Sequence, residues 1–109
     1  MQRLRHRADF LAAATGVKVP TAAFVLQARK RGDDGPIRVG FTATRKIGTA
    51  VERNRVRRRL KEIVRLSAAT GLSGGHDYVL VGRRAALSLP FAQMTEDFKR
   101  AVRRLRVPK

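Results

Sequence analysis

The residues of this sequence best placed to do chemistry are cations, and they cluster in one segment. Residues 53–61 read RNRVRRRLK, which puts six cations and no acid into nine positions. Arginine binds phosphate through a planar fork of N–H donors, so the segment suits a polyanion better than it suits catalysis. If the segment is helical, Arg55/Arg59 and Arg57/Lys61 lie one turn apart, where each like-charge pair costs about 0.2–0.5 kcal/mol. A bound polyanion would offset this repulsion, and we expect nucleic acid to be that partner.

No group of side chains in the sequence has the arrangement of an enzyme active site. His6 lies in a basic N-terminal stretch, and His76 follows two glycines with no carboxylate or cysteine at a metal-ligand spacing. The acids at 33–34 fall in a predicted turn, and those at 96–97 begin a predicted helix, where the helix dipole favours them. The absence of cysteine excludes thiolate zinc sites and cysteine catalysis. We therefore expect no catalytic residue and no metal ligand in this chain.

The composition indicates one small, very basic domain. The 109 residues carry 25 Lys+Arg against 8 Asp+Glu, a net charge of +17, and 43% of them are hydrophobic. That apolar content suffices for a core, and the length suffices for a single domain over residues 1–109. No apolar run approaches the roughly 20 residues of a membrane span, and no signal segment is visible, so we expect a cytoplasmic protein without a membrane partner. Residues 1–7 and 107–109 are expected to be flexible.

The pattern of apolar residues predicts an α/β fold. Helical patterns cover residues 8–14, residues 49–67 and the segment from residue 90 onward. Strands are predicted at 17–19, 24–30, 37–44 and 77–84. The turn formers at 31–36 predict a hairpin between the second and third of these strands. Strand 37–44 alternates between an apolar face and a small polar face that carries Thr42 and Thr44.

The helix predicted at 49–67 has an apolar face and a basic face. Thr49 and Glu52 have the spacing of a capping box, which sets the start of the helix. Four apolar residues form one stripe at i, i+4, i+7 and i+8: Val56, Leu60, Ile63 and Val64. The opposite face carries Asn54, Arg58, Lys61 and Arg65, flanked by further arginines. The same helix is thus expected to contribute to the core and to present cations.

Residues 38–62 strongly resemble the signature of the protein component of bacterial ribonuclease P, including the RNR core at 53–55. The resemblance extends to residues 7–10, 24–26 and 77–81. It implies a ribosomal protein S5 domain 2-like α+β sandwich, with a four-stranded sheet, about three helices and a left-handed β-α-β crossover. The implied partner is a large catalytic RNA that removes the 5′ leader of precursor tRNA. This chain would then be the protein subunit of an endoribonuclease, with Mg²⁺ and the chemistry held by the RNA.

Applied to this sequence, the resemblance and the basic helix give two sets of contact residues. The set expected to bind the RNA subunit follows the helix: Arg53, Asn54, Arg55, Arg57, Arg58, Arg59, Lys61 and Arg65. The set expected to hold the leader in a cleft between the sheet and the first helix comprises Phe10, Thr42, Thr44, Arg45 and Lys46. The family often has aromatic residues where this chain has Ala14 and Gln27, which makes the expected leader contacts more polar. No small-molecule substrate is expected.

The residues alone also fit two other kinds of nucleic-acid-binding protein. A ribosomal or ribosome-associated protein would share the charge and the size. A sequence-nonspecific DNA-binding protein would share the basic helix, although no helix-turn-helix or zinc-finger spacing is present. The composition does not distinguish RNA from DNA, since 5 Phe and 1 Tyr form no obvious base-stacking platform.

Overall fold

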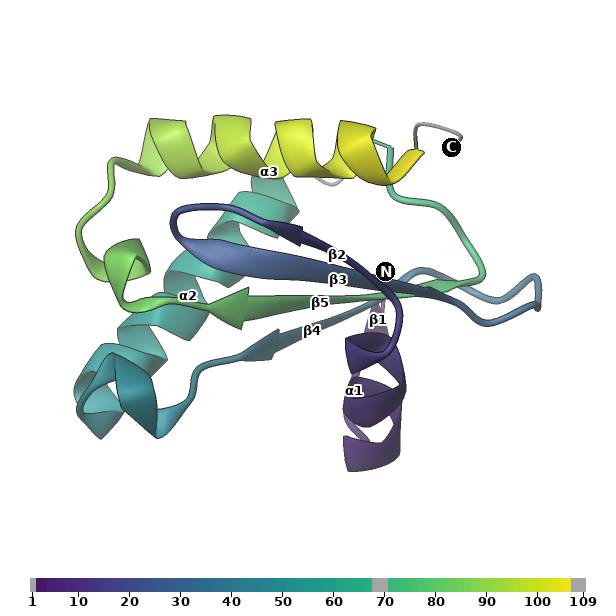
Figure 1. Cartoon of the computed structure of the whole chain (residues 1–109), viewed down its shortest axis with the longest axis horizontal. Coiled ribbons are helices and arrows are strands. Elements are labelled where there is room, and N and C mark those ends of the chain that lie inside the picture. Colours follow the sequence, from purple (N-terminus) through teal and green to yellow (C-terminus); the bar gives the residue numbers. More distant parts are fainter. Residues whose placement is uncertain (1, 68–70, 107–109) are drawn as a thin grey trace.

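The computed structural model describes residues 2–67 and 71–106 as a sheet with helices on both faces (Figure 1). In this part of the chain the elements are β1 (Gln2–Arg3), α1 (Arg7–Ala14), β2 (Val17–Pro20), β3 (Phe24–Lys30), β4 (Arg38–Thr42), the 3-10 helix η1 (Arg45–Ile47), α2 (Ala50–Ser67), β5 (His76–Gly82), the 3-10 helix η2 (Arg84–Leu87) and α3 (Phe91–Arg106). The three α-helices and the four longer strands lie where the sequence predicts them. Residue 1 and the predicted flexible end at 107–109 lie outside the described residues.

The strands form one mixed sheet in the order β1-β4-β5-β3-β2. Strand β5 is antiparallel to β3 and parallel to β4, so that Leu80 lies opposite both Leu26 and Phe41. The predicted hairpin between β3 and β4 is therefore wrong, because β5 lies between them. The turn formers at 31–36 reverse the chain, but a local signal does not determine which strand occupies the neighbouring place. The position between β3 and β4 is occupied by β5, whose central residues are buried on both faces.

The sheet has five strands instead of the expected four because the N-terminus adds a short edge strand. Residues 2–3 pair in parallel with the start of β4. The N–H groups of Gln2 and Leu4 donate to the carbonyls of Ile37 and Val39, at 2.8 and 2.9 Å. Leu4 is buried, and this single apolar residue fixes an arginine-rich stretch against the sheet. The sequence predicts that residues 1–7 are flexible, whereas the structure places residues 2–4 against the sheet.

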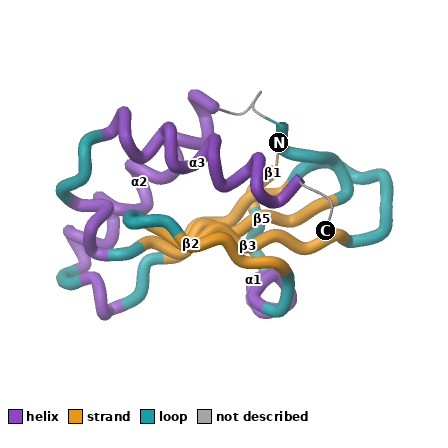
Figure 2. The backbone as a smooth tube through the Cα atoms, turned by 45° about the horizontal axis from the view of Figure 1, so that its top comes forward, coloured by secondary structure: helices purple, strands orange, loops and turns teal. Residues whose placement is uncertain are grey.

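The unit β4–α2–β5 joins two neighbouring parallel strands through a helix. In Figure 1 both strands run toward the left, β5 lies above β4, and α2 lies behind the sheet. This arrangement makes the crossover left-handed, as the resemblance implies and against the usual right-handed preference. Helices α2 and α3 pack together on one face of the sheet, and α1 covers the other face (Figure 2).

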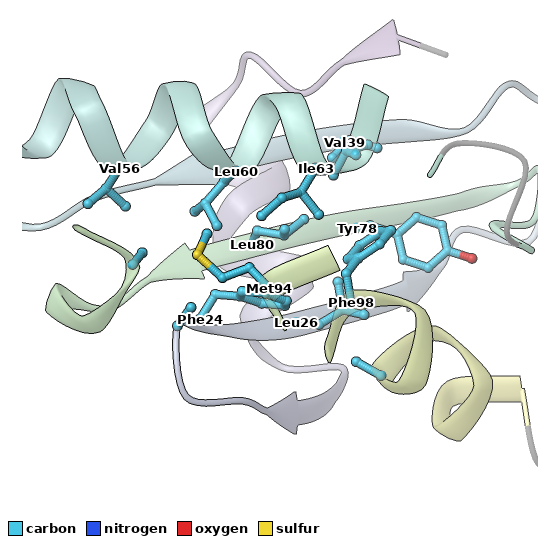
Figure 3. Close-up of a cluster of buried hydrophobic side chains, with 14 of the residues drawn as sticks. Phe24, Leu26, Val39, Val56, Leu60, Ile63, Tyr78, Leu80, Met94 and Phe98 are labelled. Carbon is cyan, nitrogen blue, oxygen red and sulfur yellow. The ribbon is translucent and has the colours of Figure 1, made fainter. Parts of the chain in front are cut away.

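The main core lies between the sheet and the two long helices (Figure 3). The complete predicted stripe of α2 is buried in it: Val56, Leu60, Ile63 and Val64. The stripe meets buried residues of β3, β5 and α3, among them Leu26, Leu80 and Phe98. A smaller cluster lies on the opposite face, where Leu4, Ala13 and Val79 are buried between α1 and the sheet. The two clusters fix α2 and α1 on opposite sides of the same strands.

The start of α2 is the predicted capping box. The backbone N–H of Glu52 donates to Oγ1 of Thr49 at 3.2 Å, and the N–H of Thr49 donates to Oε1 of Glu52 at 3.0 Å. The hydrogen bond from Thr49 lowers the pKa of Glu52 against the opposing effect of burial, and Arg84 lowers it further. The cap therefore fixes the beginning of the cationic helix. None of the helices in residues 2–67 and 71–106 is long and apolar enough to cross a membrane.

Candidate nucleic-acid interface

The outer face of α2 presents cations to solvent. Arg55, Arg58 and Arg65 are exposed, and so is Asn54. Arg65 pairs with Glu62, and Arg57 donates a hydrogen bond to Oδ1 of Asn54 at 2.5 Å. The described residues give Arg55 and Arg58 neither an acid nor a hydrogen-bond acceptor. Their guanidinium groups are therefore available to phosphate without first breaking an internal contact.

Two of the residues expected to contact RNA, Arg53 and Arg59, make hydrogen bonds within the protein. Arg53 donates to the carbonyl of Gly48 at 3.1 Å, next to the capping box. Arg59 reaches from α2 to the turn before α3, where it donates to the carbonyls of Leu87 at 3.4 Å and Leu89 at 2.5 Å. Its Nε is buried without a partner among the described residues.

The sequence places Arg59 beside the outer face of the helix, whereas the structure turns its guanidinium toward these carbonyls. On a helical wheel, position 59 lies three residues after Val56 and four before Ile63, so its side chain flanks the apolar stripe. From there the long side chain extends along the core surface to the carbonyls of Leu87 and Leu89. A guanidinium group has several N–H donors and can hydrogen-bond to both carbonyls. Arg59 thus ties α2 to the turn before α3, and fewer arginines of α2 point outward than the sequence suggests.

Lys61 is intermediate between the exposed arginines of α2 and those that bond within the protein, because its side chain is partly buried. Burial lowers the pKa of Lys61, and the positive charges of Arg3 and Arg57 lower it further. The charge of Arg3 reaches Lys61 because β1 carries the N-terminus to the side of α2. Arg3 of β1 and Lys61 of α2 therefore lie close together and add their charges on this side of the molecule.

The second predicted surface is the face of the sheet that α1 covers only in part. In the register of the sheet, Thr42 lies beside Val81, and Val81 lies beside Val25. These three residues are partly buried. The neighbouring row is buried on the face that carries α1: Gly40, Val79 and Gln27. Thr42, Val81 and Val25 therefore form an open strip of sheet beside α1, which we call the open strip.

Phe10 of α1 forms the border of the open strip. Its ring packs against Gly40, where an added Cβ would lie only 2.5 Å from a ring carbon. Only glycine at this place lets the helix approach the strand so closely. Phe10 also packs on the smaller core cluster and is partly buried. It thus has a structural role in the core, and it also keeps some exposed surface at the border of the open strip.

The other predicted leader contacts lie at the end of β4. Thr44, Arg45 and Lys46 are all exposed. They are held by Ile47, the next residue of η1, which is buried in the main core. Arg83, the first residue after β5, is also exposed at this end of the sheet, where it donates to the carbonyl of Thr21 at 2.7 Å. The open strip is therefore bordered by cations on two neighbouring connections.

A buried ionic network holds α1 and β4 in place on this face. The carboxylate of Asp77 is fully buried and accepts hydrogen bonds from Arg31 at 2.5 Å and from Arg38 at 2.7 and 2.8 Å. Arg38 also lies 3.5 Å from the carboxylate of Asp9 on α1. Burial would raise the pKa of Asp77, but the hydrogen bonds from Arg38 and Arg31 outweigh it, so the pKa is lowered. The network therefore links α1, β4 and β5 at one end of the sheet.

Sequence reasoning missed three residues of this surface: Val25, Val81 and Arg83. The sequence signal for Val81 is its alternation along β5, with Arg83 two residues further on, but the four consecutive apolar residues of β5 conceal this alternation. Val25 shares its face of β3 with Gln27, and its place in this surface depends on which strand lies beside β3. Only the observed register brings Val25, Val81 and Thr42 together.

These observations describe a basic α+β protein with two exposed surfaces whose residues suit a polyanion. Among residues 2–67 and 71–106, no three His, Cys, Asp or Glu side chains are grouped as metal ligands. The exposed arginines of α2 suit a phosphate backbone, and the open strip suits a single strand laid across it. Helix α2 and the face of the sheet beside α1 lie on opposite sides of the molecule (Figure 2).

Comparison with known proteins identifies the class more closely. A family model described as Ribonuclease P matches residues 1–106. A ribonuclease P protein component from Gluconacetobacter diazotrophicus is 47% identical over 103 residues, covering 94% of this chain and 89% of its own length. One from Ruegeria pomeroyi is 46% identical over 109 residues, with 97% and 87% covered. The chain belongs to the ribonuclease P protein family.

Solved structures agree with this assignment. The RNase P protein from Thermotoga maritima superposes with a TM-score of 0.81 at 29% identity, covering 98% of this chain and all of the other. The protein from Staphylococcus aureus has a TM-score of 0.79 at 22% identity, which supports the fold. The chain is thus a protein subunit of the ribonucleoprotein endoribonuclease that matures tRNA, and its partner is RNA. This membership replaces the ribosomal and DNA-binding alternatives.

Proposed function

We propose that this chain binds the catalytic RNA of ribonuclease P through the outer face of α2 and holds the 5′ leader of precursor tRNA on the open strip. The observation that supports the first contact is the exposed pair Arg55 and Arg58, which no acid among the described residues neutralises. The observation that supports the second is the uncovered row at Thr42, Val81 and Val25, bordered by Arg45 and other cations. Since precursor tRNA is the substrate, we place this activity in the cytoplasm.

In this proposal Mg²⁺ is held by the RNA. Magnesium prefers oxygen ligands in an octahedral arrangement, and the acids of the described residues are not grouped for it. Several acids are already paired with arginine: Asp77, Glu62 and Glu52. The protein contributes positive charge instead. Its cations neutralise phosphates that would otherwise recruit Mg²⁺, so the assembled enzyme needs less of the metal.

Reconstitution tests the proposal as a whole. The purified protein is mixed with its cognate RNA subunit and precursor tRNA at a Mg²⁺ concentration that limits the RNA alone. We expect removal of the 5′ leader to be faster with the protein than without it, because protein cations replace part of the metal's screening. Cleavage that stays at the rate of the RNA alone over the whole Mg²⁺ range would contradict the proposal.

The leader contact has a sharper test in Thr42→Glu. The new carboxylate lies on the open strip, where a leader phosphate would approach, and like charges in a shared site repel. We expect the holoenzyme to bind precursor tRNA about tenfold more weakly, which corresponds to ~1.4 kcal/mol. Binding of mature tRNA, which has no leader, should change little. Equilibrium binding of the two tRNAs to the same holoenzyme measures both.

The matched control for this variant is Ala92→Glu, which adds the same charge at an exposed position of α3. It should leave the ratio between precursor and mature tRNA affinities unchanged. Equal losses for the two tRNAs in Thr42→Glu would remove the open strip from the leader contact, even if reconstitution succeeds.

A further inference from the structure

A hollow of the surface lies where β1, β4 and α2 meet. It has a volume of about 460 Å³ and is lined by Gln2, Arg3, Val39, Phe41, Lys61, Val64 and Arg65. We call it the Phe41 groove. It is separate from the open strip, because Phe41 and Thr42 are consecutive in β4 and point to opposite faces of the sheet. No acidic residue lines it.

The floor of the groove is apolar, and its centre is a partly exposed aromatic ring. Val39 and Val64 are nearly fully buried, whereas Phe41 is only partly buried. The reason is the length of β1, which pairs with residues 38–39 and leaves β4 beyond Val39 without a neighbour on that edge. Leu4 then directs the chain toward α1 on the other face. The side of Phe41 therefore lies open between the sheet edge and α2.

The rim of the groove is positive. Arg3 pairs in register with Val39, which places it on the α2 side of the sheet. Lys61 and Arg65 reach the rim from α2, so three positive side chains surround one hollow. Arg3 lies close enough to Lys61 to lower its pKa, in addition to the larger effect of burial. Among the described residues neither Arg3 nor Lys61 has an acid within ion-pair distance, whereas Arg65 pairs with Glu62. An apolar floor beneath a cationic rim fits a nucleobase whose flanking phosphates lie on the rim.

We propose that the Phe41 groove binds one unstacked nucleotide of the RNA partner, with its base against Phe41 and a phosphate between Arg3 and Lys61. Proteins recognise single-stranded RNA by stacking bases on aromatic side chains and holding the backbone with cations, and this groove offers both. The inference rests on the proposed function, since it gives α2 a second contact with the same RNA. It also gives β1 a role, because β1 brings Arg3 to the site.

The test measures the affinity of the protein for its RNA subunit together with nucleotide-resolution chemical probing of that RNA. Phe41→Leu keeps an apolar side chain but removes the ring, and it should weaken binding at least about fivefold, the lower range for loss of one stacking aromatic. It should also expose one unpaired nucleotide that the unchanged protein protects. Arg3→Glu should expose the same nucleotide without touching the core.

Two controls separate this effect from folding and from net charge. Phe91→Leu removes a partly buried ring elsewhere in the main core, and Arg104→Glu makes the same charge change on α3. Both should preserve the protection of that nucleotide. Thermal unfolding of each variant shows whether it is folded.

The inference is overturned if Phe41→Leu and Arg3→Glu protect the RNA as their controls do. In that case a loss of binding on replacing Arg55 and Arg58 would show that the proposed function stands and only the groove is unused. If those replacements also have no effect, the proposed function itself fails. A change in the sedimentation of the free protein with Phe41→Leu would mean that a second copy of the chain occupies the groove, which also overturns the inference.

Discussion

Replacing both Arg55 and Arg58 by alanine is expected to weaken binding of the RNA subunit by tenfold or more and to lower its salt dependence. Each cation that neutralises a phosphate contributes about 0.7–0.9 to the slope of log affinity against log salt concentration. Loss of both contacts should therefore reduce the slope by about 1.4–1.8 units. Binding titrations at several salt concentrations give the slope directly.

The same double variant should leave the free protein at least as stable as before. Both side chains are exposed and unpaired among the described residues, and alanine has the higher helix propensity. The substitution also removes like-charge repulsion between Arg55 and Arg59, which lie one turn apart. A loss of RNA affinity without a loss of thermal stability would show that these arginines are maintained for binding.

Arg103→Ala with Arg104→Ala is the matched control, because it removes two exposed cations from α3. The control should change the salt slope less than the α2 variant does. Equal changes would mean that the protein binds RNA through its net charge of +17, without a defined face on α2. That result would contradict the assignment of α2 as the interface.

Much of the structure of α2 can be predicted from its sequence, because residues within the helix itself determine where it starts and which face is buried. The spacing of Thr49 and Glu52 sets the start, and the stripe from Val56 to Val64 sets the buried face. Side chains on the centre of the opposite face can only point to solvent. The direction of the Arg59 side chain does not follow from this pattern, because Arg59 lies at the border of the stripe, where a long cation can turn either outward or along the core. Its choice depends on the carbonyls of Leu87 and Leu89, which arrive from later in the chain.

The order of the strands in the sheet cannot be predicted from local sequence patterns, because it depends on contacts between segments far apart in the chain. The alternation in residues 37–44 correctly separates the core face from the face with Thr42, since a half-buried strand has only two faces. The position of β5 between β3 and β4 depends on the crossover through α2, and no turn signal encodes it. Strand β1 was missed because two paired residues and one buried leucine are too short a pattern to recognise. The open strip and the Phe41 groove both depend on these nonlocal pairings, so only the fold could reveal them.

The buried network around Asp77 predicts the largest loss of stability from a single substitution. Asp77→Asn keeps the shape of the side chain but removes the charge that two arginines share. Arg31, whose side chain is only 9% exposed, would then lose its buried acid and retain only the exposed Asp33. Breaking a buried pair by removing one partner costs about 3–5 kcal/mol, because the remaining charge is left uncompensated. Urea unfolding at neutral pH measures this difference in the free energy of unfolding.

The effect should depend on pH in a defined direction. The folded state lowers the pKa of Asp77 below the unfolded value of about 3.9, so the stabilisation is fully present above that value. It is lost as pH falls through the lower, folded pKa, because the protonated carboxyl no longer holds the arginines. The difference between the original protein and Asp77→Asn should therefore be largest near neutral pH and should shrink below about pH 4.

Asp34→Asn is the matched control, since Asp34 is exposed in the 31–36 turn and makes no ion pair among the described residues. It should change the unfolding free energy by less than about 0.5 kcal/mol at any pH. A deficit in Asp77→Asn that is the same at pH 3 and pH 7 would show that the packing of the side chain matters and its charge does not. A deficit that vanishes in acid would show that the charge of Asp77 holds α1 against β4, and with it the border of the open strip.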